Sequence, residues 1–182
     1  MTDFNTIAEV IGDLAQGRMV VLVDERSQDP QGLESVGEGE LVMLAQHATA
    51  AAVNLMIRQT GSQPVVAAAP ERLEALQLHA MVPDGQGPRG AAFMVAVNAR
   101  PLPGTGVSAR DRAATIRRLA DPDSRPEDFV QPGHVTPLRA QAGGVLRRAG
   151  HTEAAVDQAR LAGMQPVAAM ATILDEAGEV AS

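Results

Sequence analysis

Short apolar runs alternate with amphipathic stretches along this chain, and this alternation constrains its fold more than any other feature. Apolar runs typical of strands lie at 19–23, 64–68, 92–98 and 166–174. Apolar residues recur at helical spacing within 5–16, 49–59, 70–77, 108–120 and 153–162. Strands that alternate with helices predict a mixed α+β or α/β domain, with a central mixed sheet flanked by helices.

Residues at the ends of these stretches predict where the elements begin and stop. Asn5 and Thr49 are expected to cap the first two helices, and Ser108 with Asp111 fits a variant capping box. The run 19–23 is uniformly apolar, which favours a buried strand. Polar stretches rich in Gly, Pro and acidic residues predict loops at 24–39, 82–90 and 121–132.

Length and composition exclude several classes of protein. A chain of 182 residues is expected to form a single domain over 1–182. No apolar run approaches the ~18 residues of a membrane span, so no membrane partner is expected. A net charge of −7 without Tyr or Trp argues against nucleic-acid binding. The absence of cysteine and of a secretion signal favours a cytoplasmic location.

The stretch His134–Glu153 concentrates groups that bind anions and move protons. Thr152 at a predicted helix start, with Arg148 close by, is typical of a phosphate site. His151 is a candidate for metal binding or proton transfer. A plain helix cap with solvated arginines accounts for the same spacing equally well. Pro132-Gly133 before His134 predicts a rigid turn, on which a histidine is more often structural than functional.

Two other stretches carry candidate chemistry. Small residues in Gly104–Ser108 can cradle a phosphate before a helix, although an ordinary capped loop is the simpler interpretation. The 24–40 region holds six carboxylates, whose oxygens suit hard cations such as Mg²⁺. A solvated acidic loop explains their spacing better than a metal site does. The six carboxylates are Asp24, Glu25, Asp29, Glu34, Glu38 and Glu40.

Four stretches carry a family resemblance: GRMVVLVDE, GELVMLAQHAT, TGVSARDRAATIRRLADPDSRPEDF and PGHVTPLRAQAGGVLRRAGHTEAAVDQARLAG. In this order, and over nearly the whole chain, the sequence resembles the 3,4-dihydroxy-2-butanone 4-phosphate synthases of riboflavin biosynthesis. The resemblance implies that ribulose 5-phosphate is enolised and rearranged and loses one carbon as formate. It further implies a homodimer and a divalent cation, Mg²⁺ or Mn²⁺.

The resemblance also assigns roles to individual residues. It implies His151 as the metal ligand and His134 as an active-site histidine supplied by the partner subunit. Glu38 and Glu40 match the last Glu and Asp of the family's acidic loop and are assigned to catalysis. The residues expected to bind the phosphate or the substrate are Arg148, Thr152, Thr105, Ser108 and Arg139.

Several positions depart from the family pattern. The metal-binding glutamate of the family falls on Val36, and its late acid–base glutamate falls on Thr172. Glu34 is a candidate replacement ligand, and the family's C-terminal segment is absent from this sequence. The sequence therefore predicts a divergent synthase that binds ribulose 5-phosphate or a similar sugar phosphate, with an impaired or altered lyase reaction. The alternative is an inactive homologue that binds a phosphate ligand or regulates an active synthase.

Overall fold

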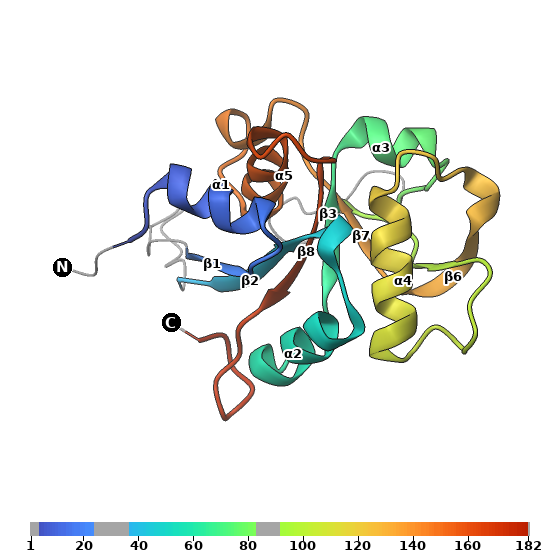
Figure 1. The fold of residues 1–182 in the computed structure, drawn as a ribbon, viewed down its shortest axis with the longest axis horizontal. Helices are drawn as coiled ribbons and strands as arrows, with labels where there is room; N and C mark the ends of the chain where they lie inside the picture. The colour runs from blue at the N-terminus through green and yellow to red at the C-terminus, as the bar shows by residue number, and fades with distance from the viewer. Residues whose placement is uncertain (1–3, 24–36, 83–91, 182) are drawn as a thin grey trace.

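The computed structural model describes residues 4–23, 37–82 and 92–181, and it confirms a mixed α+β fold (Figure 1). Within these residues, six strands form the main sheet in the order β1-β2-β8-β3-β7-β4, and β5 pairs with β6 in a second sheet. Strands β3 and β7 are parallel, and the other described pairs are antiparallel. The strands are β1 (Val20–Val23), β2 (Gly39–Leu44), β3 (Val65–Ala68), β4 (Ala92–Phe93), β5 (Val97–Ala99), β6 (Phe129–Val135), β7 (Pro137–Arg139) and β8 (Val167–Thr172).

Helices cover both faces of the main sheet, and the central strand β8 shows why. Ala168 and Met170 pack in a core cluster with residues of α1 and α5, whereas Ala169 and Ala171 pack in the cluster of α2 and α4. Successive side chains of a strand point to opposite faces of the sheet. A strand between two helical layers is therefore apolar on both of its faces where the helices cover it. The helices are α1 (Ile7–Ala15), α2 (Ala50–Thr60), α3 (Pro70–Ala75), α4 (Ala109–Ala120) and α5 (His151–Leu161).

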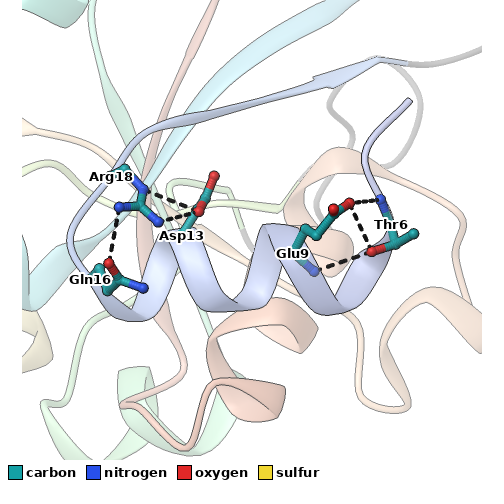
Figure 2. Close-up of polar contacts among 5 residues, drawn as sticks. All are labelled: Thr6, Glu9, Asp13, Gln16 and Arg18. Carbon is teal, nitrogen blue, oxygen red and sulfur yellow. Dashed lines mark hydrogen bonds and ion pairs between the residues drawn. The ribbon is translucent and has the colours of Figure 1, made fainter. Parts of the chain in front are cut away.

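The N-cap of the first helix lies one residue later than predicted. Thr6, not Asn5, is the N-cap of α1 (Figure 2). The Glu9 N–H donates to Thr6 Oγ1 at 3.3 Å, and the Thr6 N–H donates to Glu9 Oε2 at 2.8 Å. The bonds that the Thr6 N–H and hydroxyl donate to Glu9 Oε2 lower the pKa of the Glu9 carboxyl, with the backbone bond as the main cause. The Thr-x-x-Glu spacing of a capping box was the signal that favours Thr6.

Two strand predictions need correction. The run 19–23 is not a buried strand: β1 lies at the edge of the main sheet, where Val21 and Val23 are exposed. The stretch 92–98 is not one strand, because β4 joins the main sheet and β5 joins β6. The expected loop at 121–132 contains the start of β6 at Phe129. By contrast, Thr49 caps α2 as predicted and accepts a hydrogen bond from the Ala52 N–H at 3.1 Å.

Candidate functional site

The N-terminal turn of α5 carries Thr152, one of the predicted phosphate-binding residues, and a second, Arg148, shortly precedes it. The helix begins at His151 with Gly150 as its N-cap, so Thr152 is not a capping residue as one interpretation had it. Thr152 lies instead in the first turn and is buried. The Ala154 N–H makes the first helical bond, to the Gly150 carbonyl, at 2.9 Å. The N–H groups before it lie at the positive end of the helix dipole, which favours an anion.

A buried carboxylate, Glu153, holds Arg148 beside this turn. Glu153 is fully buried, and its Oε2 accepts a hydrogen bond from Arg148 Nη1 at 2.7 Å. Its Oε1 accepts from the backbone N–H of Gln141 at 2.8 Å. Gly150 makes room for this arrangement, since a Cβ there would lie 2.7 Å from Glu153 Oε2 and 2.8 Å from Arg148 Nη1. Glu153 was missed as a site residue, although an acidic residue in a helix's first turn is a recognisable signal.

Two further predicted site residues, His151 and Arg139, lie at the start of α5 and at the end of β7. His151 is the first residue of α5 and is half-buried. Arg139 ends β7 and is exposed, two residues before Gln141, whose N–H binds Glu153. The segment that follows β7 thus meets α5 at Glu153.

A second carboxylate lies between strands β2 and β8. Glu40 is 6% exposed, and its Oε1 accepts a hydrogen bond from Thr172 Oγ1 at 2.6 Å. Thr172, predicted to match the family's late glutamate, thus contacts Glu40, predicted to match its loop aspartate. Glu38 is half-buried just before β2. Ser35, Val36 and the candidate ligand Glu34 lie outside the described residues.

The described part of the chain does not by itself form a cation site. There, no three His, Cys, Asp or Glu side chains come together in a way that holds a metal ion. His151 and Glu40 therefore do not complete a cation site with other described residues.

His134 belongs to a separate group of polar residues on the β5–β6 sheet. It lies within β6, so the predicted turn at Pro132–His134 is wrong. The His134 N–H donates to Asn98 Oδ1 at 2.9 Å, and Asn98 Nδ2 lies 3.2 Å from His134 Nδ1 and 3.4 Å from the Thr105 carbonyl. Gly133 allows this close approach, because a Cβ there would collide with the backbone of Val97 and Asn98. Asn98 was also missed by the sequence analysis.

The loop before α4 completes this second group. Ser108 caps α4 as predicted, accepting a hydrogen bond from the Asp111 N–H at 3.1 Å. The expected capping box is incomplete, because Asp111 Oδ2 accepts instead from the Gly106 N–H at 3.2 Å. A Cβ at Gly104 would collide with Asp111 Oδ2. The loop with Gly104 and exposed Thr105 is therefore closed around the Asp111 carboxylate.

Arg112 ties this loop to β6. Its Nε donates to the Val107 carbonyl at 2.9 Å, and its Nη1 donates to the His134 carbonyl. Burial lowers the pKa of the Arg112 guanidinium, which nevertheless keeps its charge at neutral pH. Ser108 and His134 are therefore held in one rigid unit.

The two groups occupy different parts of the chain. The helices α4 and α5 pack against opposite faces of the main sheet, and Figure 1 shows α4 with β6 well to the right of α5. A cavity of about 670 Å³ lies between the end of α4 and the turn before β8, and none of the predicted site residues lines it. The predicted site residues thus fall into two separate groups, one with Arg148 and Thr152 and one with Thr105, Ser108 and His134.

Known proteins share both the sequence and the fold. The profile of the 3,4-dihydroxy-2-butanone 4-phosphate synthase family matches residues 8–182. The riboflavin biosynthesis protein RibBA of Aquifex aeolicus is 46% identical over 98% of this chain and 43% of its own length, and that of Mycobacterium avium is 43% identical over 98% and 40%. The chain therefore spans less than half the length of these relatives.

Solved structures of synthases superpose closely on this fold. A 3,4-dihydroxy-2-butanone 4-phosphate synthase in complex with two magnesium ions is 42% identical, with a TM-score of 0.87 over 95% of this chain and 77% of that one. A two-domain synthase from A. baumannii is 38% identical, with a TM-score of 0.86 over 97% and 50%. In the described part of the chain, the helices are too short or too polar to cross a membrane. The chain belongs to the 3,4-dihydroxy-2-butanone 4-phosphate synthase family.

Proposed function

We propose that this chain is a lyase of the 3,4-dihydroxy-2-butanone 4-phosphate synthase type, which binds ribulose 5-phosphate or a similar sugar phosphate and releases formate. Family membership supports the reaction, and the first turn of α5 beside Arg148 carries the assignment of the phosphate site. A cytoplasmic location forms part of the proposal. The rate is expected to be reduced, because a positioned acid–base group contributes about 10²–10⁴-fold and the position of the family's late glutamate holds Thr172.

Two copies of the chain are proposed to build each complete site. The N–H groups of the first α5 turn, Thr152 and Arg148 bind the phosphate, since helix N-termini and guanidinium groups both favour phosphate oxygens. The partner subunit of a homodimer supplies Thr105, Ser108 and His134. The separation of the two groups within one chain supports this arrangement (Figure 1). Glu40, buried beside Thr172, is proposed as the acid–base carboxylate, with Glu38 next to it in sequence.

A divalent cation is proposed as a requirement of the reaction. The support is the related synthase that contains two magnesium ions. The described residues do not form a cation site alone. This chain's own residues are proposed to bind the phosphate at α5 and to transfer a proton at Glu40.

Formate release is the direct test of this proposal. Purified protein with ribulose 5-phosphate and excess Mg²⁺ is expected to release formate at a rate that rises in proportion to the enzyme concentration. Removing the cation with EDTA is expected to abolish the release, and added Mg²⁺ or Mn²⁺ to restore it. Formate dehydrogenase coupled to NADH absorbance measures the rate. A rate equal to the enzyme-free blank at high enzyme concentration would contradict the lyase assignment and favour the inactive homologue.

Ligand-induced stabilisation tests the phosphate site without requiring turnover. Ribulose 5-phosphate is expected to raise the melting temperature, because a ligand that binds only the folded state stabilises it. Arg148→Ala is expected to abolish this shift, measured against the variant's own ligand-free melting temperature. Arg58→Ala removes an exposed arginine of α2 and is expected to keep the shift. A full shift in Arg148→Ala would remove Arg148 from the site.

A further inference from the structure

The hydroxyl of Thr172 and the carboxylate of Glu40 join two strands across 132 residues of sequence. Thr172 Oγ1 lies 2.6 Å from Glu40 Oε1, and a hydroxyl facing a carboxylate must act as the donor. The carboxylate is buried, so its direction is set by protein groups rather than by bulk water.

The β2–β8 ladder fixes this pair in space. Glu40 and Thr172 are register partners, and the neighbouring Ile173 N–H donates to the Gly39 carbonyl at 2.8 Å. Hydrogen-bonded and non-hydrogen-bonded pairs alternate, so Glu40 and Thr172 form a non-hydrogen-bonded pair, whose side chains lie closest. Ser62 Oγ donates to the Thr172 carbonyl at 2.7 Å, which anchors the end of β8.

The two side chains differ in the freedom they bring to this contact. Threonine is β-branched and has few rotamers in a strand, whereas glutamate loses much more rotamer freedom on ordering. The rigid member of the pair is therefore the donor, and the flexible member is the carboxylate.

We infer that Thr172 is a positioning residue that fixes the direction of the Glu40 carboxylate for proton transfer. This inference rests on the proposed function, in which Glu40 exchanges the proton with the sugar phosphate. Thr172 takes no proton itself, because a threonine hydroxyl lacks the basicity of a carboxylate. It supplies one short hydrogen bond that holds the acid–base group in a single orientation, and so it acts through Glu40.

Matched substitutions of Thr172 separate positioning from packing. Thr172→Val keeps the shape and removes the donor, and it is expected to lower kcat about 10- to 100-fold with KM within about twofold of wild type. Thr172→Ser restores a donor on a smaller side chain and is expected to recover most of kcat. Crystal structures of both variants are expected to show the Glu40 carboxylate rotated away in Thr172→Val and retained in Thr172→Ser.

The kcat values and the crystal structures of the variants test this inference separately from the proposed function. Unchanged kcat in Thr172→Val, or equal losses in Val and Ser, overturns the positioning role. If the wild-type protein releases no formate, the lyase proposal fails, and the crystal structures still decide whether Thr172 holds Glu40. A Glu40 carboxylate that keeps its direction in Thr172→Val overturns the inference in either case.

Discussion

Mixing His134→Ala chains with Arg148→Ala chains is expected to restore formate release to about a quarter of the wild-type rate, although each variant alone is nearly inactive. Arg148 lies with the first turn of α5, and His134 lies in β6 on the other side of the main sheet (Figure 1). If each site combines the first group of one chain with the second group of its partner, each single variant damages every site. Loss of such a group is expected to cost about 10²–10⁴-fold.

The recovery follows from the symmetry of a two-fold dimer. In a mixed dimer, the His134→Ala chain supplies an intact Arg148 to the site that receives His134 from the Arg148→Ala chain. The other site of that dimer carries both substitutions. Random reassembly makes about half of the dimers mixed, each with one intact site of two, which gives about a quarter of the wild-type activity.

A matched mixture within one group provides the control for this experiment. Mixing His134→Ala with Asn98→Ala combines two defects in the same group, because Asn98 contacts His134 directly. Every site then keeps at least one damaged group, so no recovery is expected. Activity is measured after the chains are unfolded and refolded together, and dimer content is followed by light scattering. Failure of the first mixture, with mixed dimers present, would mean that each site is built from one chain.

The layered fold could be predicted from the sequence, because buried strands and helices show characteristic patterns of apolar residues. The run that becomes β8 is apolar from Val167 to Ala171, before Thr172, and its alternate residues enter the two core clusters. The helix caps Thr49 and Ser108 were predicted correctly, because Thr and Ser are strongly preferred at the N-cap position. The prediction of Asn5 as a cap was wrong. Its neighbour Thr6 has the reciprocal capping-box spacing with Glu9, and Thr6 is the N-cap.

The site contacts could not be predicted because they join residues far apart in sequence. Asn98 meets His134 across 36 residues, and Glu40 meets Thr172 across 132. Pro132-Gly133 resembles a turn locally, and yet this segment lies in β6 because Gly133 allows the backbone of β5 to approach. Such pairings depend on the tertiary fold, which overrides local propensity.

Glu153→Ala is expected to lower the free energy of unfolding by about 3–5 kcal/mol, the usual cost of removing one partner of a buried ion pair. Glu153 is fully buried and binds both Arg148 Nη1 and the Gln141 N–H, so its removal deletes the acceptor of both hydrogen bonds. Urea denaturation measures the change. The phosphate-dependent rise in melting temperature is expected to disappear with it, because Arg148 loses the contact that holds it beside the first turn of α5.

Glu153→Gln distinguishes charge from hydrogen bonding at this position. The amide oxygen can still accept from the Gln141 N–H, whereas residue 153 no longer carries the negative charge that faces Arg148, so an intermediate loss is expected. Asp13→Ala serves as the surface control: its carboxylate lies 2.5 Å from Arg18, but both side chains are about half exposed, and such pairs contribute at most about 1 kcal/mol. If Glu153→Ala costs no more than Asp13→Ala, Glu153 does not hold Arg148 in place.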